Sequence, residues 1–176
     1  MDRCVLYRRM LKRFFALAVI ISVFCFSPVT AFAADSRLND GAGLLSSQQQ
    51  DRLLSVLDEV SVRQNFDIAV VTVKSLDGSS PMQYADDYYD SHGYLDDGAL
   101  LLVCMDSRDW YISTCGYGIT VFTDAGIQYI GEQIKEDLSD GDFSEAFDKF
   151  VGLCDDFITQ ARSGDPYDSH NLPKEP

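Results

Sequence analysis

The sequence contains little histidine and few basic residues, and both shortages argue against whole classes of function. Its two histidines, His92 and His170, are too few for a typical zinc centre or for a hydrolase that uses a Ser-His-Asp triad. The chain has 14 Lys and Arg against 28 Asp and Glu in 176 residues, a formal net charge of -14. Because nucleic acids are bound through clustered basic side chains, this balance argues against a nucleic-acid partner.

Several motifs of phosphate chemistry are also absent. No glycine-rich phosphate loop opens a predicted helix. Cys104 is not followed by an arginine at the interval that cysteine phosphatases require, because Arg108 comes too early. No D-x-D-x-[TV] sequence follows a predicted strand. The sequence therefore argues against cysteine phosphatases and against enzymes that form an aspartyl phosphate.

The one long apolar run lies near the N-terminus and has the features of an export signal. Residues 14–26 are apolar apart from Ser22, follow a mainly basic segment and precede Ala31-Phe32-Ala33. This order is typical of a secretory signal peptide, and the run is shorter than the roughly 20 residues that span a bilayer. We predict that residues 1–33 are a signal peptide cleaved after Ala33, so that the protein is secreted or lies in the cell envelope. The alternative is an uncleaved segment that anchors the chain in the membrane.

An odd number of cysteines remains after the predicted signal peptide. Cys4 and Cys25 lie within it, which leaves Cys104, Cys115 and Cys154. Three cysteines cannot form a fully paired disulfide framework. We expect them to be small buried hydrophobic side chains.

The rest of the chain shows the alternation of helices and strands that is typical of an α/β domain. A serine followed by glutamine three residues later forms a capping box at Ser46 or Ser47, just before apolar residues at helical spacing. We predict helices over residues 47–64 and 81–91 and beginning near 123 and 142, and strands over residues 66–73, 99–105 and 110–115. The first two strands form a parallel βαβ unit, and the third pairs with the second as an antiparallel hairpin. The predicted fold is a three-layer α/β sandwich with a small mixed sheet between helices, over residues 34–163, followed by a disordered tail over residues 164–176.

The predicted hairpin brings acidic side chains from separate segments to one end of the sheet. With a turn over residues 106–109, residue 97 lies opposite residue 118. The acids gathered in this way are Asp67, Asp96, Asp97 and Asp124. Crowded carboxylates repel one another unless a cation neutralises them, and their oxygens suit Ca²⁺, Mg²⁺ or Mn²⁺. The alternatives are a helix-dipole role for Asp124, a turn at Asp96 and Asp97 and simple solvation of Asp67.

Four segments, in order, resemble the TPM domain family. They are residues 38–46 (LNDGAGLLS), residues 67–73 (DIAVVTV), residues 97–103 (DGALLLV), and residues 116–119 (GYGI) with Thr123 and Asp124. The resemblance extends over about residues 37–160. It implies a compact α/β sandwich with an acidic pocket for a divalent metal, Ca²⁺ being favoured. By motif matching it assigns Asp40, Asp96 or Asp97, and Asp124 to that pocket, while Asp67 rests on the predicted geometry alone.

The same resemblance leaves two functions open. Weak acid phosphatase activity is attributed to some members of the family, and a role in the repair or assembly of membrane complexes to a plant member. Here Ile119 and Thr120 stand where the family often has an acid, so one possible metal ligand is missing. We favour an envelope interaction module that binds Ca²⁺, or alternatively Mg²⁺ or Mn²⁺, over a metal-dependent acid phosphatase of low activity.

The expected partners are a divalent cation and proteins of the envelope or membrane, and we expect the protein to be a monomer. Tyrosines of the helix over residues 81–91, Tyr84, Tyr88 and Tyr89, and Tyr94 after it, either face a partner or pack onto the sheet. Both interpretations fit their helical spacing.

Overall fold

The computed structural model describes residues 36–174, which form nine helices and strands. The predicted signal peptide lies outside the described residues. In chain order the elements are β1 (Leu38–Asp40), α2 (Ser47–Gln64), β2 (Asp67–Val73), α3 (Pro81–Ser91), β3 (Gly98–Cys104), β4 (Asp109–Cys115), α4 (Gly118–Val121), α5 (Asp124–Asp140) and α6 (Phe143–Arg162).

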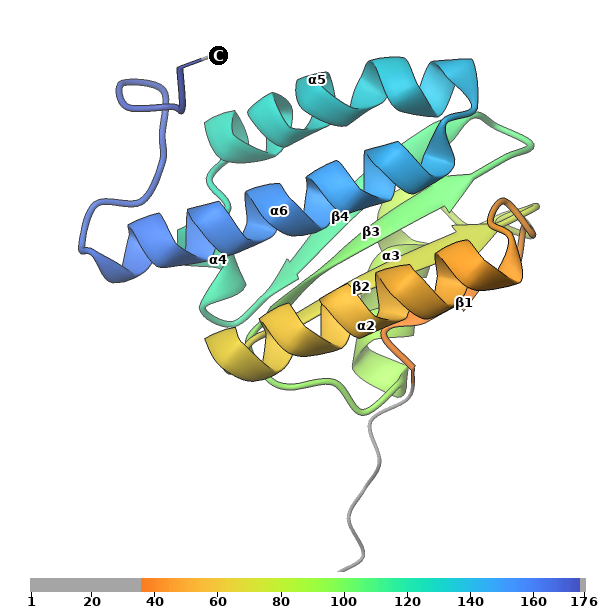
Figure 1. The fold of residues 1–176 in the computed structure, drawn as a ribbon, viewed down its shortest axis with the longest axis horizontal. Coiled ribbons are helices and arrows are strands. Elements are labelled where there is room, and N and C mark those ends of the chain that lie inside the picture. Colours follow the sequence, from red (N-terminus) through yellow and green to blue (C-terminus); the bar gives the residue numbers. More distant parts are fainter. Residues whose placement is uncertain (1–35, 175–176) are drawn as a thin grey trace, which may run out of the picture. The chain divides into compact units, whose positions relative to one another are not determined.

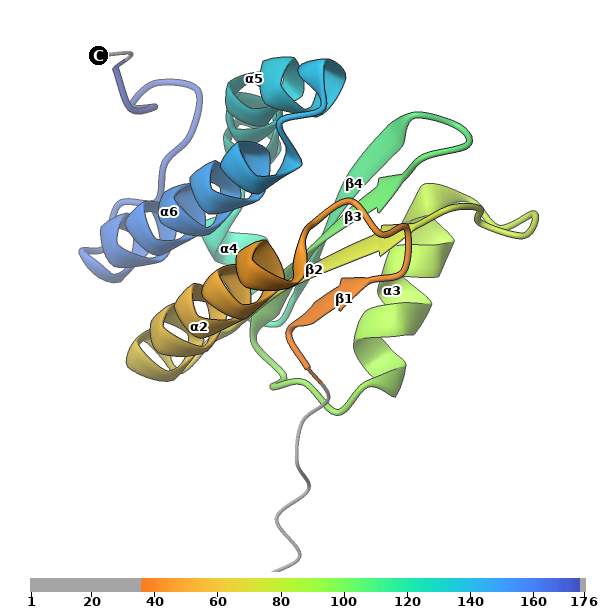
Figure 2. The same cartoon turned by 45° about the vertical axis from the view of Figure 1, so that its right-hand side comes forward.

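The strands form one mixed sheet in the order β1-β2-β3-β4. β1, β2 and β3 are parallel, and β4 runs antiparallel to β3. Helix α3 covers one face of the sheet, whereas α2, α5 and α6 cover the other (Figures 1 and 2). The predicted three-layer sandwich with a mixed sheet is confirmed. The sequence analysis missed β1 and α4, because three or four residues are too few to show a periodic pattern.

Local sequence signals account for where the longer helices begin. Helix α2 has the capping box at Ser46, whose hydroxyl accepts a hydrogen bond from Gln49 N, so the first of the two candidate serines is the cap. Helix α3 begins with Ser80 as its N-cap and Pro81 in its first turn. The central strands β2 and β3 are buried on both faces, which explains their continuous apolar sequences.

The hairpin between β3 and β4 has a different register from the predicted one. Its turn covers residues 105–108, so that Cys104 pairs with Asp109 and Gly98 pairs with Cys115. The predicted turn over residues 106–109 was wrong by one position, and the pairing that followed from it was therefore wrong by two. Because side chains alternate with a period of two, this shift leaves each side chain on its predicted face of the sheet.

The three cysteines among residues 36–174 are free thiols. Cys104 and Cys154 are buried, as predicted, and Cys115 is half-buried. In the observed register Cys115 lies opposite Gly98, about 20 Å along the strand from Cys104. That separation excludes a disulfide between them.

The segment after α6 is not the disordered tail that the sequence predicted. The ring of Tyr167 packs edge-on against Phe157, with ring centroids 4.8 Å apart. The hydroxyl of Thr123 donates a hydrogen bond to the Tyr167 carbonyl at 2.9 Å. A polar, proline-containing segment is thus held against the domain by one aromatic anchor. Within residues 36–174, no helix is long and apolar enough to cross a membrane.

Candidate acidic site

Asp96 and Asp97 lie where β3 begins, directly beside the loop that follows β4. The backbone N–H of Tyr117 donates a hydrogen bond to Asp97 Oδ1 at 2.6 Å. A Cβ atom at Gly116 would overlap the Asp96 carbonyl oxygen and the Asp97 carboxylate, so this close approach requires glycine. The predicted contact between these acids and the Gly116–Gly118 loop is therefore present, despite the shifted register.

Asp67 lies at the same end of the sheet but is already neutralised. It pairs with Gly98 in the parallel ladder, and its side chain is 1% exposed. Arg37 Nη2 lies 2.6 Å from Asp67 Oδ1, and the backbone N–H of Leu95 donates to Asp67 Oδ2 at 2.6 Å. Asp67 is thus neither solvated nor open to a metal ion, because an arginine and a backbone amide occupy its oxygens.

Asp40 lies at the opposite end of the sheet from Asp67. It is the last residue of β1 and pairs with Thr72, five residues further along β2 than Asp67. Its carboxylate accepts hydrogen bonds from the Thr72 hydroxyl, from the backbone N–H groups of Leu44 and Leu45, and from the Gln50 amide. Burial raises the pKa of Asp40, but these hydrogen bonds outweigh burial and hold the pKa below its ordinary value. The side chain therefore organises the loop before α2.

Replacing Asp40 with alanine is expected to lower the free energy of unfolding by about 1–2 kcal/mol at pH 7. Since the folded-state pKa of Asp40 is lowered, the carboxylate stabilises the fold above the unfolded pKa of about 3.9. That stabilisation is lost as the pH falls through the folded-state pKa. Urea unfolding of both proteins at pH 7 and pH 3 tests this, with Asp51→Ala on the exposed side of α2 as the control. An equal difference at both pH values would contradict it.

Asp124 stands apart from the other acids. It is the first residue of α5, it is exposed, and Thr123 provides the helix cap by accepting a hydrogen bond from Gly126 N. Within the described residues, Asp124 belongs to no group of three or more His, Cys, Asp and Glu side chains that could hold a metal ion. Its position in the first turn fits the alternative role, stabilisation of the helix dipole.

Two acids of α3, Asp86 and Asp90, add negative charge near Asp96 and Asp97. The sequence analysis overlooked both of them. Asp86 accepts a hydrogen bond from the Ser113 hydroxyl at 2.6 Å, which places this side of α3 against β4. Burial is the main cause of the raised pKa of the Cys115 thiol, and the nearby carboxylates of Asp90, Asp96 and Asp97 raise this pKa further. Asp86 and Asp90 are four residues apart on one helix face, and that spacing was the signal available in the sequence. We call Asp90, Asp96 and Asp97 the acidic rim.

Few acids of the described residues are paired with a basic side chain. Five acids outside the rim form ion pairs with Arg or Lys, namely Asp58, Asp67, Asp137, Asp148 and Asp155. None of the three rim acids forms an ion pair with a described basic residue. The rim is therefore a concentration of uncompensated negative charge.

The five acids predicted as metal ligands do not form a ready coordination site. Within the described residues, no group of three or more His, Cys, Asp and Glu side chains is arranged to hold a metal ion. Asp40 is at the far end of the sheet, Asp67 is paired with Arg37, and Asp124 is separate. Of the predicted set, Asp96 and Asp97 alone share a site with available oxygens.

This fold, with its acid-glycine pair before β3 and its Gly-Tyr-Gly loop after β4, defines a class of protein. The TPM domain model matches residues 38–156, and the chain belongs to the TPM domain family. It is 26% identical over 144 residues to the UPF0603 protein YdjH of Bacillus subtilis (strain 168), a match covering 78% of this chain and 56% of that protein. The chain thus spans little more than half the length of this relative.

Solved structures share the fold at low sequence identity. The N-terminal domain of a P. gingivalis protein has a TM-score of 0.64 at 18% identity, covering 78% of this chain and 90% of that domain. The N-terminal domain of the cg2496 protein from Corynebacterium glutamicum has a TM-score of 0.56 at 17% identity, with coverages of 85% and 97%. The BA42 protein from Bizionia argentinensis has a TM-score of 0.57 at 15% identity, with coverages of 75% and 91%.

Proposed function

We propose that this TPM-domain protein is an exported interaction module of the cell envelope, whose acidic rim binds Ca²⁺ weakly and whose α3 face receives a basic partner. The observation that carries the proposal is the closeness of three carboxylates, Asp90, Asp96 and Asp97, around Cys115, none of them paired with a described basic residue. Such a surface attracts cations over a distance of about 8–10 Å at ordinary salt.

The donor set limits the kind of metal site that is proposed. Asp96 and Asp97 supply two neighbouring carboxylates, and water would complete the coordination shell. Ca²⁺ accepts irregular oxygen ligands more readily than Mg²⁺, which requires a near-octahedral shell. We therefore propose a low-affinity Ca²⁺ site, not a buried cage.

The α3 face adds aromatic rings to this negative charge. Tyr88 stacks on His92 with ring centroids 3.6 Å apart, and Tyr84 stacks on Tyr88 at 6.4 Å. Tyr89 is buried in the core beneath α3, while Tyr84, Tyr88 and Tyr94 are half-buried. Half-buried rings next to carboxylates suit Lys and Arg side chains, which bind to both. All four rings thus pack toward the sheet, and the exposed parts of Tyr84, Tyr88 and Tyr94 support the proposed interface.

The phosphatase alternative lacks a comparable supporting observation. A phosphate would need a cation beside the acids, and Arg37 and Arg63, which lie toward this end of the sheet, are bound to carboxylates. Hydrolysis of a phosphomonoester by the Ca²⁺-saturated protein, abolished in Asp97→Asn, would favour the alternative over the interaction module.

Calorimetric titration with Ca²⁺ tests whether the acidic rim binds this ion. The double variant Asp96→Asn/Asp97→Asn is expected to bind Ca²⁺ at least about tenfold more weakly, since asparagine keeps the hydrogen bond to Tyr117 but removes both charges. The control Asp51→Asn/Asp106→Asn removes the same charge elsewhere and should change the affinity less than about twofold. Equal weakening in both variants would mean diffuse attraction to an acidic protein, contrary to a site at the rim.

The partner-binding part of the proposal has its own test. A decalysine peptide titrated into isotopically labelled protein is expected to shift backbone amide signals of α3 and the rim. Asp87→Asn/Asp90→Asn should weaken that effect several-fold, because it removes two carboxylates from the α3 face. Shifts spread evenly over α2, α5 and α6 would contradict a specific interface.

A further inference from the structure

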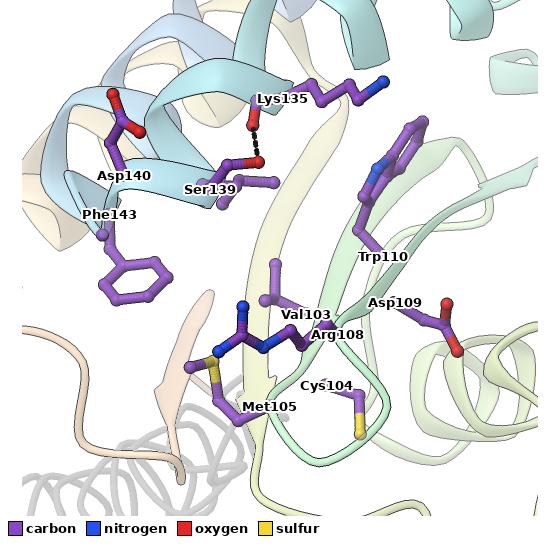
Figure 3. Close-up of a pocket in the computed structure, with 12 residues that line it drawn as sticks. Val103, Cys104, Met105, Arg108, Asp109, Trp110, Lys135, Ser139, Asp140 and Phe143 are labelled. Atoms are coloured by element: carbon purple, nitrogen blue, oxygen red, sulfur yellow. Dashed lines mark hydrogen bonds between the residues drawn. The ribbon is translucent and has the colours of Figure 1, made fainter.

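A cleft at the other end of the sheet differs chemically from the acidic rim. It has a volume of about 390 Å³ and lies between the β3–β4 turn and the junction of α5 with α6 (Figure 3). Its volume falls in the range of small-molecule binding sites. The walls combine apolar and polar side chains, among them Met105, Arg108, Trp110, Lys135, Leu138 and Phe143.

Two cations line this cleft without ion-pair partners. Arg37, Arg52 and Arg63 each pair with a carboxylate, and Arg162 donates to a backbone carbonyl. By contrast, within residues 36–174 neither Arg108 nor Lys135 forms an ion pair. Of the five described basic residues that form no ion pair, Arg108 and Lys135 are the two that line this cleft.

Arg108 points into the cleft. Figure 3 shows its guanidinium directed toward the side of Met105 and Phe143, with Val103 nearby. Its backbone is left-handed, with φ at 57°, a conformation that glycine or asparagine adopts at lower cost. The turn thus places the charged end of Arg108 at the cleft, where it is available to an anionic ligand.

The acids that line the cleft face elsewhere. Asp109 extends from the opposite side of the hairpin, and the carboxylate of Asp140 points away from the centre (Figure 3). Lys135 passes along the upper wall, with its ammonium group on the side of Trp110. The indole packs against Gly131, where a Cβ atom would overlap it, so the aromatic wall is fixed by α5.

We propose that this cleft binds a small apolar carboxylate, with the carboxylate on the Arg108 guanidinium and an aromatic or branched body against Trp110 and Phe143. The planar guanidinium forms paired hydrogen bonds with a carboxylate. A monoanion fits better than a dianion, because Asp109 and Asp140 lie at the margin and the whole chain is strongly negative. The site is independent of the acidic rim, since Cys104–Asp109 and Gly98–Cys115 are the two opposite ends of the same ladder.

The single tryptophan of the chain makes the proposal directly measurable. Trp110 is in the wall of the cleft, so its fluorescence reports on occupancy. The full-length protein is titrated with 3-phenylpropionate, with its neutral amide 3-phenylpropionamide, and with phenyl phosphate. We expect a saturable change in fluorescence with the carboxylate, at least about fivefold weaker binding of the amide, and weaker binding of the phosphate.

Matched variants test whether Arg108 and Lys135 bind the carboxylate of the ligand. Arg108→Asn, chosen because asparagine tolerates the left-handed backbone, should weaken 3-phenylpropionate about tenfold, and Lys135→Gln several-fold. Lys74→Gln removes the same charge just after β2, outside the cleft, and should leave binding unchanged. Thermal unfolding confirms that each variant is folded.

Three results would overturn the proposal. They are equal affinity for the acid and the amide, equal weakening by Lys74→Gln and Arg108→Asn, and tighter binding of phenyl phosphate than of the carboxylate. None of these depends on Ca²⁺ or on the acidic rim, so failure here is distinguishable from failure of the interaction module.

Discussion

Replacing Arg37 with glutamine is expected to lower the free energy of unfolding by about 3 kcal/mol. The Asp67 carboxylate is 1% exposed and would keep the Leu95 amide as its donor while losing the guanidinium. A buried charge without its counterion is among the most costly changes a fold can suffer. Urea unfolding monitored by circular dichroism measures the loss.

Two further variants separate the buried charge from the loss of arginine itself. Arg37→Gln/Asp67→Asn should be more stable than Arg37→Gln alone, because the asparagine is uncharged and can still accept from Leu95. The control Arg52→Gln breaks an ion pair with Asp148 in which the arginine is 69% exposed, and should cost less than about 1 kcal/mol. If the double variant were the least stable of the three, Asp67 would not be the source of the effect.

Replacing Gly98 with alanine is expected to destabilise the protein by about 3 kcal/mol, near the upper end for overpacking. The added Cβ atom would lie 2.7 Å from the Asp67 carbonyl oxygen and 2.6 Å from Tyr89 Cζ. It would also displace the Tyr89 hydroxyl, which donates to the Leu95 carbonyl at 2.8 Å. Because the neighbouring oxygen belongs to the backbone of a central strand, it cannot move aside cheaply. Thermal unfolding gives the magnitude.

Gly152 provides the matched comparison for Gly98. It lies within α6, and a Cβ atom there would meet nothing within 4 Å. Gly152→Ala should therefore stabilise the protein by about 0.5–1 kcal/mol through helix propensity. A loss of stability at Gly152, or a neutral change at Gly98, would mean that packing around these glycines is looser than the structure indicates.

The order of the longer elements could be predicted from sequence because each carries a strong local signal. The caps at Ser46 and Ser80 and the apolar runs of β2 and β3 act within a few residues. The hairpin register was wrong because the left-handed conformation of Arg108 ends the turn early, and arginine gives no sequence signal for it. The segment after α6 was likewise mispredicted because it is held by a tertiary contact, in which the ring of Tyr167 packs against Phe157.

The candidate acidic site was predicted only in part, because it too depends on contacts between segments that are far apart in the sequence. Parallel pairing correctly brought Asp67 to the end of the sheet where Asp97 lies, since strand order alone determines that. Its neutralisation by Arg37 could not be foreseen, because the pair is 30 residues apart in sequence and β1 was not recognised. The position of Asp40 also depended on β1, the strand that the sequence analysis missed. β1 places Asp40 at the opposite end of the sheet from Asp67.

The carboxylates around Cys115 also bear on redox chemistry. Disulfide exchange and oxidation proceed through the thiolate, and burial together with Asp90, Asp96 and Asp97 raises the pKa of this thiol. A raised pKa leaves less of the half-buried Cys115 as thiolate at a given pH, so its oxidation and disulfide exchange are slower. If the chain is exported to an oxidising compartment, as we predict, the negative field around this thiol acts as a form of chemical protection.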